Sequence, residues 1–146
     1  MIRAFLRRLT RDAALADDLA QVTFIKAYEK QSGLKSLDAA KAWLFKIAYR
    51  TFVDHVRKDI RRKELMEGRV EDNPPEAPPG LALDIEEAMN TLAPECRAVV
   101  ILCLAHGMSH SEAAKATGMP LGTVKSHVNR GKEKLRTFLQ AYEKAD

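Results

Sequence analysis

The sequence has few of the features that mark secreted, fibrous or membrane-spanning proteins. Its two cysteines, Cys96 and Cys103, cannot build a disulfide framework and indicate a reducing, cytoplasmic compartment. No apolar run approaches the roughly 18 residues of a membrane-spanning helix, and the basic start of the chain lacks the apolar core of a signal peptide. The balance of 46% hydrophobic and 30% charged residues excludes collagen-like and wholly disordered classes. A globular protein without membrane insertion is expected.

Val, Ile and Thr are sparse, and no stretch alternates between apolar and polar residues as a strand would. We therefore predict an all-α fold. Four of the six prolines lie between residues 73 and 80, where they favour an extended, solvated chain. This composition predicts two small helical domains, residues 1–66 and 83–146, joined by a flexible, acidic and Pro-rich linker over 67–82.

Charge is unevenly distributed, although the net charge is only +4. Residues 1–63 carry 15 Lys and Arg against 7 Asp and Glu, residues 64–95 carry 1 against 9, and residues 96–146 carry 8 against 4. Two basic blocks favour a polyanionic partner such as nucleic acid. Solvated helix faces joined by an acidic spacer would give the same pattern, so charge alone leaves both interpretations open.

Capping and helix-breaking residues predict the individual elements. In the first half we expect helices over 2–9 and 13–30, a loop over 31–37, and a long helix capped by Asp38 that reaches residue 64. In the second half we expect helices over 83–91 and from Pro94 to Gly107, then a short one over 111–117. Ser109 and Glu112 have capping-box spacing, and Gly118 ends the short helix. A final helix begins at Pro120 and runs towards residue 144.

The two helices around Gly118 have the form of a DNA-binding helix-turn-helix. One face of the final helix is apolar, with Val124, Val128, Gly131, Leu135 and Phe138 at helical spacing. The opposite face carries side chains that can bond base edges in a major groove: Lys125, Ser126, Asn129, Arg130 and Glu133. A helical hairpin with a solvated basic face is the alternative.

The long helix of the first half carries an aromatic ring among cations. Trp43, Lys46, Arg50, Arg57 and Arg61 fall on one side of it, whereas Phe45, Ala48, Phe52, Val56 and Ile60 fall on the other. Regularly spaced cations can follow phosphates while the ring stacks on a base, which suits unpaired nucleic acid. In the alternative interpretation, Trp43 belongs to the core and the cations only face water.

A metal site is the third pattern considered. Cys103, His106 and His110 have a spacing that zinc ligands can adopt, but Gly107 should break the helix between the two histidines. A zinc-dependent enzyme would need this metal. No nucleophile–base set or glycine-rich phosphate loop stands out. We therefore expect no metal, no cofactor and no catalytic residues.

Taken in order, several segments resemble bacterial RNA polymerase sigma factors of the extracytoplasmic-function (ECF) group of the sigma-70 family. Residues 17–24 (DDLAQVTF) resemble the acidic segment of that group, and residues 43–48 (WLFKIA) with 54–57 (DHVR) resemble its −10 helix. Residues 92–97 (LAPECR) resemble the lead-in to its −35 domain. Residues 108–114 (MSHSEAA) and 118–127 (GMPLGTVKSH) resemble its helix-turn-helix.

The resemblance assigns roles to individual residues. It implies that the chain binds core RNA polymerase through its β′ and β subunits and directs transcription initiation from promoter DNA. Core polymerase would be bound by Asp17, Asp18, Gln21 and Phe24. The −10 element would be bound by Trp43, Lys46, Arg50, Arg57, Lys58 and Arg61, with an extruded base held by the loop 31–37. The −35 element would be read by Thr123, Lys125, Ser126, His127, Asn129 and Arg130.

The resemblance also implies an anti-sigma factor that wraps or wedges between the two domains. Family members usually carry a further helix ahead of the position of Met1, so we expect part of the polymerase-facing surface to be missing from this sequence. A sigma mimic that binds an anti-sigma factor without promoter recognition is the alternative function. Such a mimic should have lost the cations of its recognition helices, whereas Arg57, Lys125 and Arg130 are present.

Overall fold

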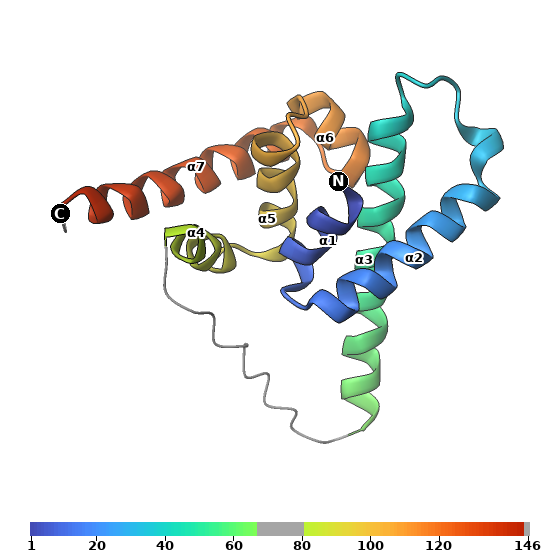
Figure 1. The fold of residues 1–146 in the computed structure, drawn as a ribbon, viewed down its shortest axis with the longest axis horizontal. Coiled ribbons are helices and arrows are strands. Elements are labelled where there is room, and N and C mark those ends of the chain that lie inside the picture. The colour runs from blue at the N-terminus through green and yellow to red at the C-terminus, as the bar shows by residue number, and fades with distance from the viewer. Residues whose placement is uncertain (67–80, 145–146) are drawn as a thin grey trace.

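The computed structural model describes residues 1–66 and 81–144, and within these ranges it contains helices and no strand, which confirms the all-α prediction. The first half comprises α1 (Ile2–Thr10), α2 (Ala13–Glu29), the 3₁₀ turn η1 (Gln31–Gly33) and α3 (Ala40–Leu65). The second half comprises α4 (Leu81–Asn90), α5 (Pro94–Val100), the π-helical turn η2 (Ile101–Ala105), α6 (His110–Thr117) and α7 (Leu121–Glu143) (Figure 1). Of the predicted linker, residues 67–80 lie outside the described residues, and Leu81 begins α4.

Across 1–66 and 81–144, none of the helices combines the length and apolarity that a bilayer crossing requires.

Local capping chemistry places several helix ends where the sequence predicts them. Ser109 accepts from the Glu112 amide at 3.1 Å, and the Glu112 carboxylate accepts from the Ser109 amide at 2.9 Å, so the predicted capping box is confirmed. Gly118 has φ 75° and ends α6 in the left-handed conformation. Gly118 therefore turns the chain between α6 and α7.

One local prediction was wrong. Asp38 does not cap the long helix: α3 begins at Ala40, and its N-cap residue Ala39 makes no side-chain capping bond. Backbone bonds from Ala39 to Ser36 and from Ala40 to Leu37 already close this turn, and the Ser36 hydroxyl accepts from the Ala39 amide at 3.3 Å. The turn thus already pairs the Ala39 and Ala40 amides without Asp38.

The helix predicted from Pro94 to Gly107 changes its winding before it ends. Residues Ile101–Ala105 are π-helical, and the His106 amide donates to the Ile101 carbonyl at 3.2 Å. Gly107, with φ 66°, then turns the chain. A π-helical turn holds about one residue more than an α-helical turn, so the side chains that follow it point in a different direction. His106, the next residue, therefore faces the first half of the molecule.

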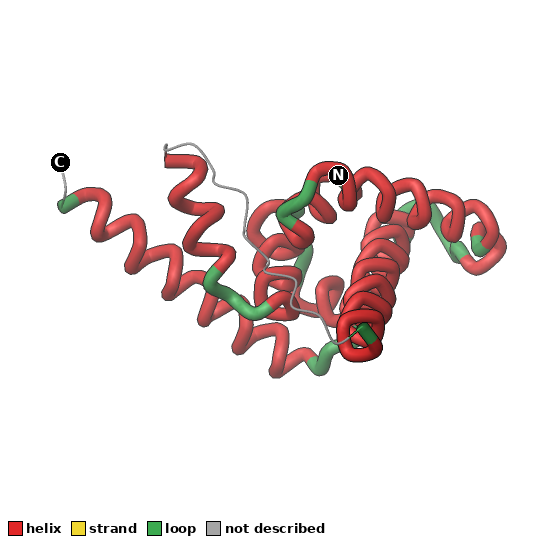
Figure 2. Tube along the Cα trace, turned by 90° about the horizontal axis from the view of Figure 1, so that it is seen from below, coloured by secondary structure: helices red, strands yellow, loops and turns green. Residues whose placement is uncertain are grey.

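The two halves share one hydrophobic core. A single cluster of buried side chains extends from Phe5 and Phe45 in the first half to Val99, Leu102 and Val124 in the second. Helix α6 packs against α3, and α5 packs against α1. Figures 1 and 2 place α4 and α7 on one side of this shared core and α2 and α3 on the other. The apolar surfaces of both halves are thus buried against each other.

The contact between α5 and α7 depends on a glycine, and this yields a first prediction. A Cβ added at Gly131 would collide with the buried Val100 side chain. Gly131→Ala should therefore lower the free energy of unfolding by about 1–2 kcal/mol in urea denaturation, because overpacking outweighs the usual gain of about 1 kcal/mol in helix propensity. Val100→Ala in the Gly131→Ala background should recover part of the loss.

Gly122 provides the matched control for this prediction. It lies in the same helix, and nothing stands within 4 Å of a Cβ added there. Gly122→Ala should therefore raise the free energy of unfolding by up to about 1 kcal/mol. A gain in stability from Gly131→Ala as well would contradict the close packing of α7 on α5.

Candidate nucleic-acid interface

The first half of α7 exposes a polar face above a buried apolar one. Val124 and Val128 are fully buried and hold the helix on the core. As a consequence, the opposite face is exposed, and it presents five of the six residues predicted to read the −35 element: Thr123, Lys125, Ser126, Asn129 and Arg130. Arg and Lys can bond guanine, and Asn can bond adenine with two hydrogen bonds, so this face has the donors and acceptors needed to read duplex DNA.

His127 differs from the other predicted residues of this face. It is half-buried, and among the described residues its Nδ1 has no hydrogen-bond partner. Its backbone carbonyl accepts from the Cys96 Sγ at 3.4 Å. Burial, only partly opposed by Arg130, raises the pKa of the Cys96 thiol, which therefore stays protonated and can donate. His127 is thus tied to α5 as well as to the surface of α7.

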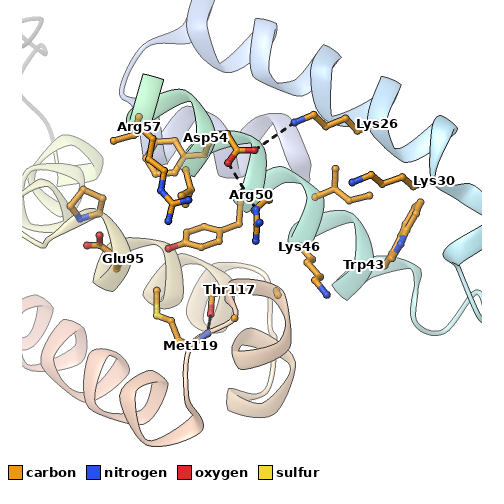
Figure 3. A pocket seen from close by; sticks show the side chains of 18 of the residues that line it. Lys26, Lys30, Trp43, Lys46, Arg50, Asp54, Arg57, Glu95, Thr117 and Met119 are labelled. Atoms are coloured by element: carbon orange, nitrogen blue, oxygen red, sulfur yellow. Dashed lines mark hydrogen bonds and ion pairs between the residues drawn. The ribbon is translucent and has the colours of Figure 1, made fainter. Parts of the chain in front are cut away.

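The second predicted DNA-binding surface lies along a cleft between the two halves. The cleft has a volume of about 970 Å³. Trp43, Lys46, Arg50 and Arg57 of α3 line one wall (Figure 3). Phe52, Val56 and Ile60, which were predicted on the opposite side of the helix, also line the cleft. Lys58 and Arg61 are exposed but are not among the lining residues. The structure thus brings together four of the six predicted −10 residues.

Two cations that the sequence analysis missed also line the cleft. Lys26 of α2 and Lys30, the residue that follows its end, extend towards α3 (Figure 3). Asp54 lies between the two helices, 4.0 Å from Lys26 and 3.9 Å from Arg50. The four-residue spacing of Lys26 and Lys30 indicates that they share one helical face. That this face borders the cleft depends on how α2 crosses α3, which the sequence does not show. The cleft is therefore more basic than α3 alone suggested.

The facing wall of the cleft comes from the second half of the chain. It consists of Pro94 and Glu95 at the start of α5 and of residues 116–119 at the turn between α6 and α7. Tyr49 lies in the cleft, where burial and Glu95 raise the pKa of its phenol, partly offset by Arg57. The hydroxyl therefore stays protonated at neutral pH and can donate a hydrogen bond.

The outer face of α2 carries the residues predicted to bind core polymerase. Asp18, Gln21 and Phe24 are exposed, whereas Asp17 is half-buried and forms an ion pair with Arg3 at 2.5 Å. The Phe24 side chain is 53% exposed, so it does not belong to the core. The apolar side chains exposed on this helix are Val22, Phe24, Ile25 and Tyr28. Such an apolar surface is typical of a contact with another protein.

The sequence pattern considered for a metal does not form a site. Within residues 1–66 and 81–144, no three His, Cys, Asp or Glu side chains are placed to hold a metal ion. Cys103 is half-buried, and burial raises the pKa of its thiol. The Nε2 atom of His106 is buried, with no hydrogen-bond partner in the part of the chain that the structure describes.

Comparison with known sequences places both halves in one family. Residues 1–62 match the sequence model of Sigma-70 region 2, and residues 82–135 match that of Sigma-70, region 4. The chain is 34% identical to the ECF RNA polymerase sigma factor SigE of Mycolicibacterium smegmatis, over 90% of this chain and 54% of SigE. It is also 34% identical to the ECF RNA polymerase sigma factor EcfG of Rhodopseudomonas palustris, over 94% of this chain and 78% of EcfG. The chain thus spans about half the length of SigE and about three quarters of EcfG.

Solved structures agree with the sequence comparison. The sigma factor RpoE, in its co-crystal structure with the anti-sigma factor NepR from Bartonella quintana, is 33% identical with a TM-score of 0.80, over 95% of this chain and 89% of RpoE. CnrH, solved in complex with the cytosolic domain of CnrY, shares the fold at 21% identity and a TM-score of 0.64, over 96% of this chain and 80% of CnrH. The matches to both sigma-70 regions, in the expected order and with ECF relatives along nearly the whole chain, show that this protein belongs to the ECF group of sigma-70 family RNA polymerase sigma factors.

Proposed function

We propose that this chain is a promoter-recognition subunit: it binds core RNA polymerase, recognises −10 and −35 elements and directs transcription initiation without catalysing a reaction itself. One observation carries the proposal. Two polar surfaces suited to different forms of DNA lie on different helices, α7 and α3, each supported by its own buried apolar face. One chain can therefore contact duplex DNA and unpaired DNA at separate places.

On α7, the exposed Lys125, Asn129 and Arg130 read the −35 element in the major groove. The N-terminal part of a recognition helix is the part that meets base edges, and these residues lie in the first three turns of α7. His127 contributes only through its half-exposed ring.

On α3, the cations bind the backbone of the −10 strand while Trp43 stacks on a base. Trp43 is half-buried, so one part of the ring packs on the protein and another remains accessible from the cleft. The loop 31–37 holds the extruded base: its residues 31–33 and 35–37 are exposed, and Leu34 is half-buried.

The outer face of α2 docks on core polymerase through Asp18, Gln21 and Phe24. An anti-sigma factor is the second proposed partner, since RpoE and CnrH were solved in complexes with NepR and CnrY. The mimic is disfavoured because Arg57, Lys125 and Arg130 are present and exposed. A protein that no longer contacts DNA has no need of these cations on its recognition surfaces.

Phe24→Ala tests the polymerase-binding surface. Because Phe24 is 53% exposed, its truncation should change the free energy of unfolding by less than about 0.5 kcal/mol. Binding to core polymerase, measured by fluorescence anisotropy of the labelled chain, should weaken by about 1–3 kcal/mol if the ring is a central anchor. Leu104→Ala, at an exposed apolar side chain on η2, is the control and should retain affinity. Equal affinities of Phe24→Ala and wild type would contradict this docking surface.

A further inference from the structure

Helix α2 carries two lysines on a flank to which the proposed function gives no role. Counting about 100° per residue around the helix, Lys26 and Lys30 lie about 100° and 60° to one side of the buried Ala27. Phe24, on the face proposed to dock on core polymerase, lies about 60° to the other side. The buried face of α2 therefore separates the lysines from the polymerase-docking face.

The two lysines lie along the same cleft as two cations of α3. Lys26 and Lys30 line it from α2, and Lys46 and Arg50 line it from α3 (Figure 3). Within each pair the residues are four apart, which is about 6 Å along a helix axis. Lys30, Lys46 and Arg50 are exposed, and Lys26 is half-buried. Two short rows of cations, one from each helix, therefore border the cleft and are accessible from solvent.

Neighbouring carboxylates do not neutralise these rows. The charged residues that line the cleft are five Lys and Arg against two acids, Asp54 and Glu95. In the part of the chain that the structure describes, Lys30 and Lys46 form no ion pair. A concave surface with this surplus of positive charge attracts a polyanion such as a nucleic-acid strand.

Asp54 lies between the two rows, at a place where a phosphate can bind. Its carboxylate oxygens are 4.0 Å from the Lys26 Nζ and 3.9 Å from the Arg50 Nε. Both ion pairs are long and partly exposed to water, so each is weak. A phosphate in the same position can accept charge-assisted hydrogen bonds from both cations. Asp54 is thus a weakly held anion that a phosphate can displace.

We propose that Lys26 and Lys30 form a second row of phosphate contacts for the unpaired −10 strand, and that a strand phosphate displaces Asp54 from Lys26 and Arg50. The inference deepens the proposed function and rests on it, because it adds the lysines of α2 to the surface proposed for the −10 element. Phosphate contacts position a strand without reading its sequence, so the two rows hold the backbone while Trp43 stacks on a base. Because the lysines and the docking face lie on opposite flanks of α2, the strand and core polymerase can be bound together.

The salt dependence of DNA binding counts phosphate contacts and tests the second row. The full chain is titrated onto a labelled, short, mixed-sequence single-stranded DNA at several salt concentrations, and binding is followed by fluorescence anisotropy. The logarithm of the binding constant falls with the logarithm of the salt concentration by about 0.7 per phosphate contacted in a single strand. Lys26→Gln and Lys30→Gln should each reduce this slope by about 0.7. Lys26→Arg and Lys30→Arg keep the charge and should retain the wild-type slope.

Two control variants separate these contacts from the net charge of the chain. Arg7→Gln removes an exposed cation of α1 that does not line the cleft, and it should keep the wild-type slope. All variants are compared at wild-type helicity by circular dichroism, and Lys26→Ala replaces Lys26→Gln if the latter is less helical.

Asp54→Asn tests the displaced anion. It should tighten binding of the same DNA by up to about fivefold, the factor that corresponds to one exposed ion pair. Glu29→Gln makes the same change in charge at an exposed residue of α2 that does not line the cleft, and it should bind like the wild type. Equal effects of Asp54→Asn and Glu29→Gln, or no effect of Asp54→Asn, would overturn the displacement of Asp54.

Lys46→Gln and Arg50→Gln, measured in the same way, distinguish this inference from the proposed function. If both α3 variants reduce the slope whereas the two α2 variants and Arg7→Gln do not, the second row is overturned and the −10 role of α3 stands. If only the α2 variants reduce the slope, the lysines contact phosphates and the −10 role of α3 is overturned. A wild-type chain that does not bind the DNA, or equal slopes for all variants, would overturn both.

Discussion

Arg97→Ala should lower the free energy of unfolding by about 3–5 kcal/mol, the largest effect we expect from a single substitution outside the aromatic core. The Arg97 side chain is 7% exposed. Its guanidinium donates to the Leu9, Met89, Asn90 and Leu92 carbonyls at 3.0–3.3 Å. Truncation would leave these acceptors unpaired and partly buried, and each unsatisfied acceptor costs about 1–3 kcal/mol.

The position of these carbonyls explains how the buried Arg97 cation is stabilised. Leu9 lies in the last turn of α1, and Met89 and Asn90 lie in the last turn of α4. The carboxyl ends of helices carry partial negative charge, so two helix ends converge on one guanidinium. Burial, with a further contribution from Arg11, lowers the pKa of Arg97, but an arginine remains charged at neutral pH.

Urea denaturation monitored by circular dichroism tests this prediction. Arg97→Lys is the informative control, because a single ammonium group keeps the charge but cannot reproduce the planar fork that reaches several carbonyls. It should lie between the wild type and Arg97→Ala. If Arg97→Ala lowered the free energy of unfolding by less than about 1 kcal/mol, water would be replacing the guanidinium at these carbonyls. The proposed stabilisation of two helix ends by Arg97 would then be wrong.

Arg130→Ala should weaken binding of the polymerase holoenzyme to its promoter by about 1–3 kcal/mol and relax base preference at one position of the upstream element. Arg130 is exposed on the face of α7 opposite the buried Val128. A guanidinium at this position can make two hydrogen bonds to a guanine edge, and alanine can make none. The loss should therefore be confined to promoters that carry the preferred base.

Arg136→Ala removes the same charge without removing the base contact. Arg136 lies six residues further along α7, about 9 Å away along the axis, and forms an ion pair with Glu133 at 3.8 Å. Affinities would be measured on promoters with single-base substitutions across the upstream element. Arg136→Ala should weaken all of them slightly and equally. A uniform loss from Arg130→Ala as well would assign that residue to a phosphate and not to a base.

The sequence predicted those features that depend on neighbouring residues. Ser109 and Glu112 cap a helix through atoms three residues apart, and Gly118 ends it because glycine alone adopts the left-handed conformation without strain. The polar face of α7 followed from the spacing of Val124 and Val128. The long helix α3 was likewise predicted to within two residues at each end, because its helical pattern depends on neighbouring residues.

What the sequence did not predict depends on contacts between distant segments. Lys26 and Lys30 join the cleft only because α2 crosses α3, and Arg97 is buried only because α1 and α4 end beside it. No local sequence pattern marks the π-helical turn before His106. The His106 ring packs on Phe5 and Phe45, which are distant in sequence. The wrong cap at Asp38 has a similar cause, because backbone bonds within the turn displaced the expected side-chain bond.

The central claim is that this chain gives core RNA polymerase its choice of promoter. The most direct measurement is run-off transcription in which purified chain and bacterial core polymerase act on fragmented genomic DNA of the source organism, followed by sequencing of the transcript 5′ ends. The account predicts transcripts whose upstream sequences share a two-part motif and which disappear when the chain is omitted. Transcripts without a shared motif, or none from a chain that forms a stable complex with core polymerase, would contradict it.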